Sequence, residues 1–237
     1  MTASETVPMP RLHVIITAAG LSRRMGVNKL LLPLEGKPIL ARTCAVFNSL
    51  EMVQDIVVTA PEGLEDEYFS LLRGCGLEKV SRVVRGGAER QDSIYEALRI
   101  LRADDDDYVA VHDAARPLIT HQLIERLCAC LADCDGVIPA VAVKDTIKRV
   151  DASGTVVETL TRSELRAVQT PQIFRHALLL RAYEAAYSQA YLGTDDASLV
   201  EHLGGRVVAV EGDYRNIKVT TAEDVAVLHK FWSEISR

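Results

Sequence analysis

One segment of the chain gathers residue types that can bind an anionic ligand. The sequence TAAGLSRRMGVNK at 17–29 joins small residues to three cations. The small residues are Ala18, Ala19 and Gly20, and the cations are Arg23, Arg24 and Lys29. Small residues let backbone N–H groups approach a ligand closely, and cationic side chains neutralise phosphate oxygens. Although neither GxxxxGK[ST] nor GxGxxG occurs in it, the segment predicts a nucleotide-phosphate cradle; a solvated basic loop is the alternative.

A carboxylate in the segment VHDAARP at 111–117 predicts a metal site. Asp113 follows a buried strand directly, and an unpaired carboxylate there would be costly unless it met a cation. A Mg²⁺ ion held between Asp113 and phosphate oxygens accounts for this position, and Arg116 could hold a second anionic group. A purely structural Asp113–Arg116 ion pair is the alternative. His112 is not required as a general base, because a phosphate that attacks as nucleophile is already ionised near neutral pH.

Two further segments give weaker signals. In RGGAERQDSI at 85–94, Gly86 and Gly87 allow close backbone approach and Ser93 could donate to a ligand, although a glycine turn with ordinary helix capping fits equally well. In NIKVTTAEDV at 216–225, Lys218 is expected on a short strand, and its pattern alone assigns it no role. Thr221, with Asp224 three residues later, predicts the start of a helix.

The elements that must position these residues alternate between strands and helices. Nearly continuous apolar, β-branched runs predict buried parallel strands at 12–18, 55–60, 80–85, 107–112 and 136–143. Helical spacing between them predicts helices at 37–49, 62–73, 90–103 and 120–133. This alternation favours an α/β fold with a doubly wound, mostly parallel sheet, which binds ligands at the carboxyl ends of its strands.

The alternation is interrupted between 144 and 170. Two alternating stretches, 145–150 and 155–160, are joined by the turn sequence Asp-Ala-Ser-Gly, which predicts a β-hairpin. An isolated hairpin is marginally stable, so this one is expected to pack against something else, such as a second subunit. The remaining elements are expected as helices at 175–190 and 195–203, strands at 206–211 and 215–219, and a final helix from Thr221.

Composition excludes several classes of protein. The 237 residues, 48% hydrophobic and 25% charged, indicate a globular chain, and no run approaches the roughly 18 apolar residues of a membrane span. A net charge of −6 argues against non-specific nucleic-acid binding. Residues 1–11 lack the apolar stretch of a secretory signal, which predicts a flexible tip on a cytoplasmic protein. The acidic run at 104–107 is expected to be a solvated turn, with Mg²⁺ binding as the alternative.

The five cysteines are an odd number thinly spread along the chain, as in a reducing compartment. Cys128, Cys130 and Cys134 lie in a single expected helix, in which only the last two share a face. No second cluster completes a zinc tetrad, so these side chains are expected to be small apolar fillers.

Seven segments together resemble the 2-C-methyl-D-erythritol 4-phosphate cytidylyltransferases, enzymes of the non-mevalonate isoprenoid pathway. The segments, in order, are 18–26, 86–94, 111–117, 144–150, 169–174, 194–201 and 216–221, within residues 13 to 232. VHDAARP and NIKVTT are the specific ones, whereas the AAG loop is shared with many nucleotidyltransferases. The resemblance implies a single Rossmann-like nucleotidyltransferase domain over 12–237, with the 144–170 hairpin as an arm that clasps a second subunit. It also implies Mg²⁺-dependent transfer of CMP from CTP to methylerythritol phosphate, with release of pyrophosphate.

The resemblance also implies a role for each matched residue. The cytidine and its phosphates would be held by Ala18, Ala19, Gly20, Gly86, Gly87 and Ser93. The catalytic cations would be Arg24 and Lys29 on the triphosphate and Lys218 on the α-phosphate. Asp113 would position Mg²⁺. The residues around methylerythritol phosphate would be Asp113, Arg116, Thr146, Arg162 and Thr170, and Thr146 and Arg162 could serve the neighbouring subunit's site.

Two departures from the family pattern stand out. Asn28-Lys29-Leu30 replaces the frequent Pro-Lys-Gln, and Ala88 replaces a frequent Asp. Residues 18–38 are closer to the molybdopterin nucleotidyltransferases, which are therefore an alternative. A ribitol 5-phosphate cytidylyltransferase is a second alternative. A catalytically silent nucleotide-binding regulator is a third, against which the presence of Lys29, Asp113 and Lys218 argues.

Overall fold

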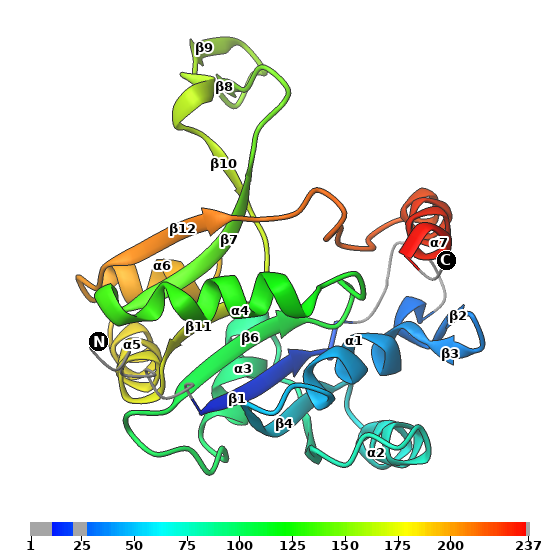
Figure 1. The fold of residues 1–237 in the computed structure, drawn as a ribbon. Helices are drawn as coiled ribbons and strands as arrows, with labels where there is room; N and C mark the ends of the chain where they lie inside the picture. Colours follow the sequence, from blue (N-terminus) through cyan, green and yellow to red (C-terminus); the bar gives the residue numbers. More distant parts are fainter. Residues whose placement is uncertain (1–10, 21–27, 236–237) are drawn as a thin grey trace, which may run out of the picture.

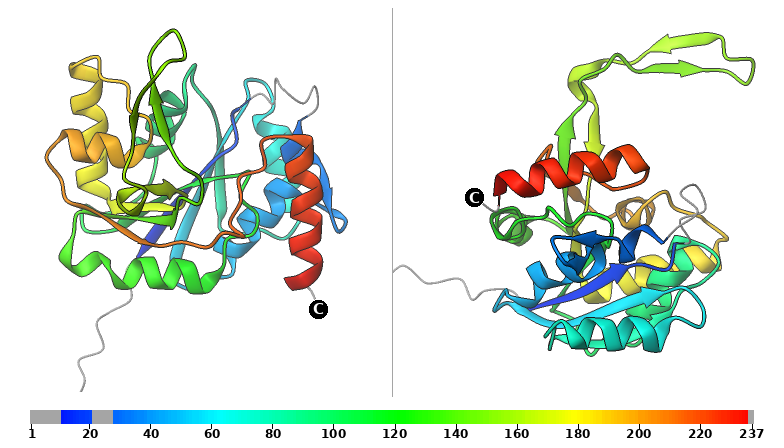
Figure 2. Two further views of the ribbon diagram at one scale, coloured as in Figure 1. Left: turned by 90° about the horizontal axis from the view of Figure 1, so that it is seen from above. Right: turned by 90° about the vertical axis from the view of Figure 1, so that its right-hand side faces the viewer.

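A twisted eight-stranded sheet with helices on both faces forms the body of the protein (Figures 1 and 2). The computed structural model describes residues 11–20 and 28–235. The flexible tip expected at 1–11 therefore lies, apart from Arg11, outside the described residues, as do Arg23 and Arg24. None of the helices in the described part is long and apolar enough to cross a membrane.

Four parallel strands form one half of the sheet, in the order β6-β1-β4-β5. They are β1 (Leu12–Thr17), β4 (Val53–Ala60), β5 (Val80–Arg85) and β6 (Tyr108–Asp113). The connecting helices are α1 (Ile39–Asn48), α2 (Glu65–Gly74) and α3 (Arg90–Leu98). The chain moves outward from β1 to β5 and then returns to the other side of β1 with β6. The switch point of the sheet therefore lies between β1 and β6, where such folds bind ligands.

The other half of the sheet is mixed. Strand β11 is antiparallel to both β6 and β7 and lies between them, whereas β12 is parallel to β7 and β10 is antiparallel to it. The elements are α4 (His121–Ala129), β7 (Gly136–Ala142), β10 (Arg166–Val168), β11 (Gln172–Arg175), α5 (His176–Ser188), α6 (Asp196–His202), β12 (Val207–Glu211) and α7 (Ala222–Ile235). The short elements are β2 (Pro33–Leu34), β3 (Lys37–Pro38) and the 3₁₀ turns Lys29–Leu31, Leu131–Asp133 and Arg162–Glu164.

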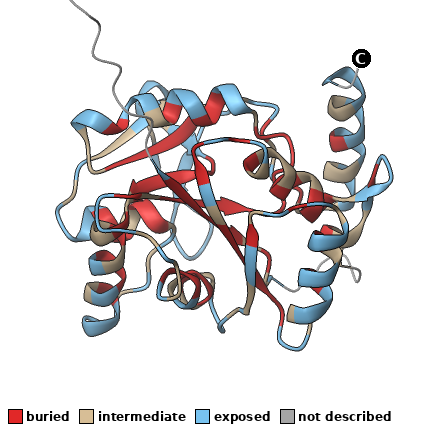
Figure 3. Ribbon diagram, turned by 60° about the horizontal axis from the view of Figure 1, so that its bottom comes forward, coloured by how far each residue is buried: buried red, intermediate tan, exposed pale blue. Residues whose placement is uncertain are grey.

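Alternating side chains of the central strands supply two apolar cores, one on each face of the sheet. On β1, Val14 and Ile16 join the core formed with α1, α2, α4 and α7, whereas Ile15 joins the core formed with α3, α5 and α6. All three side chains are fully buried. Figure 3 shows this arrangement as buried strands between helices whose outer faces are exposed. The near-continuous apolar runs in the sequence thus reflect burial on both faces, as in other doubly wound sheets.

The predicted α/β class and the predicted hairpin arm are confirmed. The arm consists of β8 (Lys148–Val150) and β9 (Val156–Thr159), which pair antiparallel and stand away from the body beyond β7 and β10 (Figure 1). Its turn is closed by Asp151, whose carboxylate accepts from the N–H groups of Ser153 and Thr155. Gly154 completes the turn at φ +85°, a conformation that glycine adopts without strain.

Some predicted boundaries are wrong. The segment 215–219 is not a strand: Val219 N–H donates to the Ala115 carbonyl, but this single bond does not extend into a ladder. The helix expected at 90–103 ends at Leu98, and the one expected at 120–133 ends at Ala129, followed by a 3₁₀ turn. Strands β10 and β11, of three and four residues, were not predicted.

The acidic run is only partly a solvated turn. The Asp104 and Asp106 side chains are exposed, but Asp107 is buried, and its carboxylate lies 3.0 Å from Nε2 of buried His13. Burial alone would raise the pKa of Asp107, but hydrogen bonds from the Asp104 N–H and from His13 outweigh it and lower that pKa. Among the described residues, no group of three His, Cys, Asp or Glu side chains could hold a metal ion. Cys130 and Cys134 do not share a helix, because Cys130 caps the C-terminus of α4.

Candidate active site

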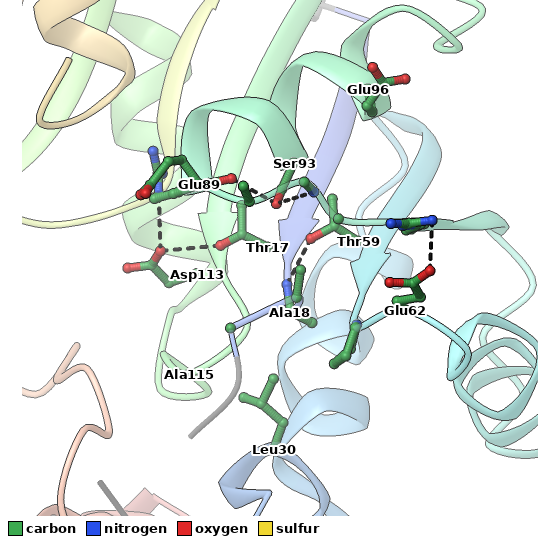
Figure 4. Close-up of a pocket in the computed structure, with 18 of the residues that line it drawn as sticks. Thr17, Ala18, Leu30, Thr59, Glu62, Glu89, Ser93, Glu96, Asp113 and Ala115 are labelled. Carbon is green, nitrogen blue, oxygen red and sulfur yellow. Dashed lines mark hydrogen bonds and ion pairs between the residues drawn. The ribbon is translucent and has the colours of Figure 1, made fainter. Parts of the chain in front are cut away.

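A pocket of about 990 Å³ opens at the carboxyl ends of β1, β4, β5 and β6 (Figure 4). It brings together most of the residues selected from the sequence: Ala18, Ala19, Gly20, Lys29, Gly86, Gly87, Ser93, Asp113 and Lys218. These residues come from four separate segments of the chain, yet they share one cavity because parallel strands end at the same edge of the sheet. The pocket is thus the predicted ligand site of a doubly wound fold.

Asp113 is the charged centre of this pocket. Its Oδ2 atom lies 2.9 Å from Lys218 Nζ and 3.4 Å from Arg116 Nε, and its Oδ1 atom lies 3.8 Å from Arg90 Nε. Thr17, opposite Asp113 in the β1–β6 register, donates its hydroxyl to Oδ1 at 3.3 Å (Figure 4). Burial alone would raise the pKa of Asp113, but the charges of Lys218, Arg90 and Arg116 outweigh it and hold that pKa well below its usual range. The carboxylate is therefore ionised at neutral pH.

A buried polar layer beneath Asp113 fixes its backbone. The Asp113 N–H donates to Thr170 Oγ1 at 3.0 Å, and that hydroxyl lies 3.1 Å from His112 Nδ1. His112 Nε2 lies 3.1 Å from the Arg116 carbonyl, which can only accept, so the neutral imidazole carries its proton on Nε2. Burial lowers the pKa of His112 to about 4. His112 is thus a neutral, buried side chain with both ring nitrogens engaged.

The loop that carries Lys218 is anchored to the same layer. Arg116 Nη1 donates to the Asn216 carbonyl at 2.7 Å, and Asn216 Nδ2 donates to the Thr170 carbonyl at 2.9 Å. Gln169 donates to the carbonyls of Asp213 and Asn216. The Asp113–Arg116 ion pair that was the structural alternative is thus present, and the same buried arginine side chain also holds the 213–219 segment. Thr170 is likewise buried and does not line the pocket.

Glycine and serine shape the wall of the pocket. A Cβ atom at Gly86 would overlap the methyl group of Ala19 and lie 2.8 Å from Ser93 Oγ, so no larger residue fits between β1 and α3. Ser93 donates its hydroxyl to the Glu89 carbonyl and accepts from the Gly87 N–H, both at 3.0 Å. These bonds hold the glycine turn at the start of α3.

The first of the small residues has its backbone donor already in use. The Ala18 N–H donates to the carbonyl and to the hydroxyl of Thr59, both at 3.1 Å (Figure 4). Ala18 therefore contributes through its small side chain rather than through its amide. Ala19 and Gly20, which follow it in the chain, also line the pocket.

Arg90 is a charged pocket residue that the sequence interpretation did not select. Arg90, the first residue of α3, lines the cavity and lies between two carboxylates: its Nη2 is 2.8 Å from Asp196 Oδ2, and its Nε faces Asp113. Asp196 is fully buried and also accepts from the Tyr183 hydroxyl at 2.5 Å. Arg90 belongs to the segment GGAERQDSI and Asp196 to the segment TDDASLVE, but only the fold shows that these two residues are in contact.

The structure does not bring the arm residues to this pocket. Thr146 and Arg162 are exposed on the arm and are not among the residues that line the cavity of the same subunit. Arg162 donates to the Lys144 carbonyl at 3.0 Å within the arm. Arg24 lies outside the described residues.

The pocket fits a divalent metal ion only if a ligand shares its coordination. Asp113 is the carboxylate at the carboxyl end of β6, and no cluster of three protein ligands exists in the described part of the chain. Mg²⁺ commonly binds through one or two carboxylates together with substrate phosphates and waters. The donor set present here is of that kind.

Known proteins that are similar to this chain over nearly its whole length are cytidylyltransferases, and the protein is accordingly an enzyme of the nucleotidyltransferase class. The family model for 2-C-methyl-D-erythritol 4-phosphate cytidylyltransferase matches residues 12–232. The relative of that name from Geotalea uraniireducens is 45% identical over 231 residues, covering 95% of this chain and 98% of the relative. The one from Bacillus cytotoxicus is 44% identical over 220 residues, covering 92% and 96%.

Solved structures agree with this class. The 4-diphosphocytidyl-2C-methyl-D-erythritol synthase of Anaerococcus prevotii has a TM-score of 0.80 at 28% identity and covers 94% of this chain and 96% of its own. The Francisella tularensis 2-C-methyl-D-erythritol 4-phosphate cytidylyltransferase has a TM-score of 0.78 at 31% identity, with coverage of 94% and 99%. The chain belongs to the 2-C-methyl-D-erythritol 4-phosphate cytidylyltransferase family. This membership confirms the resemblance to the methylerythritol phosphate cytidylyltransferases that the sequence analysis found. It does not support the alternative of a molybdopterin nucleotidyltransferase.

Proposed function

We propose that this enzyme joins CTP and 2-C-methyl-D-erythritol 4-phosphate by direct in-line attack of the acceptor phosphate on the α-phosphorus of CTP. A P–O bond forms between the acceptor phosphate oxygen and the α-phosphorus, the bond from the α-phosphorus to the bridging oxygen breaks, and pyrophosphate leaves with the bond electrons. The products are CDP-methylerythritol and pyrophosphate. No proton has to be removed from the nucleophile, which suits a site whose buried histidine, His112, is neutral and has both ring nitrogens engaged.

The contact that carries this proposal is the Lys218–Asp113 pair at the switch point of the sheet. In-line phosphoryl chemistry depends on positioning and on neutralising charge that builds up in the transition state. Lys218 lines the pocket with 43% of its side chain exposed, so its ammonium group can exchange Asp113 for a phosphate oxygen. Lys29, which also lines the pocket, would neutralise the triphosphate. Arg24 is proposed for the same role on the basis of the family motif alone.

Asp113 is proposed as the metal-binding residue. A bound Mg²⁺ would supply Lewis-acid polarisation of the phosphate oxygens. The contribution of the chain is to keep the carboxylate ionised and fixed, through Thr17 at Oδ1 and the Thr170 hydroxyl at the backbone N–H. The small wall residues Ala18, Ala19, Gly20, Gly86 and Gly87, with Ser93 behind them, are proposed to accommodate the nucleotide.

The acceptor side is proposed to be completed by a second copy of the chain. Arg116 and Thr170 lie under Asp113, where they support the carboxylate, whereas Thr146 and Arg162 project on the arm of the same subunit. The arm carries Val150 and Val156, which pair across β8 and β9 and are 53% and 55% exposed. Half-exposed paired valines on a protruding hairpin favour burial against a partner. A homodimer in which the arm brings Thr146 and Arg162 to the neighbouring pocket would bury the two valines and would also give these two residues a site to line. A cytoplasmic location stays a prediction.

The reaction is tested by measuring pyrophosphate release with Mg²⁺ and CTP in parallel for three acceptors: methylerythritol 4-phosphate, ribitol 5-phosphate and molybdopterin. We expect turnover with methylerythritol 4-phosphate only, at a kcat within about 1–10³ s⁻¹. Turnover with ribitol 5-phosphate would change the acceptor but keep the proposed site chemistry. Turnover with molybdopterin alone would contradict the acceptor that family membership implies, and binding of CTP without any turnover would identify a silent regulator.

A further inference from the structure

A chain of buried polar contacts leads from the interior of the protein to the Asp113 carboxylate. The Tyr183 hydroxyl donates to Asp196 Oδ1 at 2.5 Å, Arg90 Nη2 donates to Asp196 Oδ2 at 2.8 Å, and Arg90 Nε lies 3.8 Å from Asp113 Oδ1. Tyr183 and Asp196 are both fully buried, whereas about a third of the Arg90 side chain is exposed in the pocket. The contacts thus begin in the core and end at the reacting centre.

The position of the Asp196 carboxylate is fixed by its neighbours. Tyr183 stacks on Tyr95 of α3, with ring centroids 6.0 Å apart. The N-terminus of α6 is held to β11, because Gln172 accepts from the Ala197 N–H and donates to Asp195. Asp196 is therefore a rigid acceptor, and the guanidinium that binds it has little freedom to rotate.

Stability alone does not explain a charge pair at this place. Replacing a buried ion pair by apolar residues of similar volume is often neutral or stabilising, so such a pair is weak evidence for a structural purpose. A guanidinium, by contrast, offers several N–H groups in a planar fork, which can bind one carboxylate and still face another. Arg90 has this arrangement between Asp196 and Asp113.

We propose that Arg90 is a positioning residue for Asp113, and that the buried Asp196–Tyr183 pair serves to hold its guanidinium in place. This inference rests on the proposed function, in which Lys218 leaves Asp113 for the nucleotide. Once Lys218 has moved, the cations beside the carboxylate among the described residues are Arg116 at Oδ2 and Arg90 at Oδ1. Arg90 then holds Oδ1, so that the carboxylate retains its orientation when its closest partner departs.

The test compares variants that remove successive links of this chain. Arg90→Ala removes the guanidinium, Asp196→Asn removes the charge that holds it at nearly constant volume, and Tyr183→Phe removes only the hydroxyl. Arg175→Ala is the matched control, since Arg175 pairs with Asp106 at the opposite end of β6 and does not line the pocket. Far-ultraviolet circular dichroism and thermal unfolding establish which variants fold.

Two readouts separate a positioning role from a structural one. The first is Mn²⁺ binding in the presence of CTP, followed by electron paramagnetic resonance. We expect Arg90→Ala to lower both kcat/KM and Mn²⁺ affinity by about 10–100-fold, with a smaller loss in the same direction for Asp196→Asn and the smallest for Tyr183→Phe. The second is chemical rescue: added guanidinium ion should restore part of the kcat of Arg90→Ala, and none of that of Asp113→Asn.

The outcomes assign any failure to one proposal or the other. Folded Arg90→Ala protein with the kcat/KM and Mn²⁺ affinity of the control would overturn the positioning role of Arg90. If Arg90→Ala is impaired but guanidinium gives no rescue and Tyr183→Phe matches the wild type, the Asp196–Tyr183 clamp is refuted. If Asp113→Asn itself retains full activity, the proposed function fails at Asp113. Should Asp196→Asn not fold, Tyr183→Phe and the rescue experiment still decide the inference.

Discussion

Replacement of Lys218 by alanine should separate binding from catalysis. Lys218 Nζ lies 2.9 Å from Asp113 Oδ2, and 43% of the Lys218 side chain is exposed. Because the ammonium group exchanges one anionic partner for another when CTP binds, we expect its loss to change CTP affinity by no more than about 5-fold, or about 1 kcal/mol. Asp113 keeps Arg116 and Arg90 as partners, so the variant should still fold.

The transition-state effect of Lys218→Ala should be much larger. Loss of one preorganised donor to a developing oxyanion typically costs about 10²–10³-fold in kcat, or about 2.7–4 kcal/mol. We therefore expect kcat to fall by about that factor while the CTP dissociation constant changes by less than about 5-fold. Steady-state pyrophosphate release gives kcat, and isothermal titration calorimetry gives the dissociation constant. Lys218→Arg should recover part of kcat, and exposed Lys230→Ala on α7 serves as the control. Equal losses in kcat and CTP affinity would refute the role assigned to Lys218.

Three further perturbations probe the wall, the support and the arm of the site. Gly86→Ala places a methyl group against Ala19, so we expect a loss of about 1–3 kcal/mol in unfolding free energy together with weaker CTP binding; an unchanged melting temperature would contradict the close packing of this wall. Burial lowers the pKa of His112 to about 4, whereas histidine in the unfolded chain has a pKa of about 6.5, so the unfolded chain binds that proton first as the pH falls. The free energy of unfolding, measured with urea in the presence of a metal chelator, should therefore fall by about 2 kcal/mol between pH 7 and 5. A free energy of unfolding that does not change over this range would contradict a buried neutral imidazole. Val156→Asp on the arm should convert a dimer to monomer in light scattering, and a monomeric wild type, or a variant that stays dimeric, would count against the arm as the interface.

The sequence was most informative where local pattern and tertiary structure coincide. The β-branched runs that became β1, β4, β5 and β6 are apolar on both faces, and a doubly wound sheet follows from them directly. The residues at their carboxyl ends, Asp113 above all, could be predicted as ligands for the same reason.

The sequence was least informative where a contact depends on distant segments. Strands β10 and β11 are too short to show a period, and β11 is a strand only because β6 and β7 flank it. Arg90 and Asp196 are 106 residues apart, and each lies in a helical pattern that gives no sign of the other. Asp107 belongs to an acidic run typical of a solvated turn, yet it is buried. It pairs with His13 of β1 and with Arg11, the residue before β1.

The anchoring of the Lys218 loop to Ala115, Arg116 and Thr170 also has a consequence for synthesis of the enzyme. The strands β1, β4, β5 and β6, which end at the pocket, are translated before this loop. Lys218 lies 105 residues after Asp113 along the chain, and Asp113 gains its closest cation only when that part has been made. A nascent chain that extends only to β6 therefore lacks the ammonium group that we assign to catalysis. Because a domain folds as a unit, the active site is complete only after the segment that follows β12 has been translated.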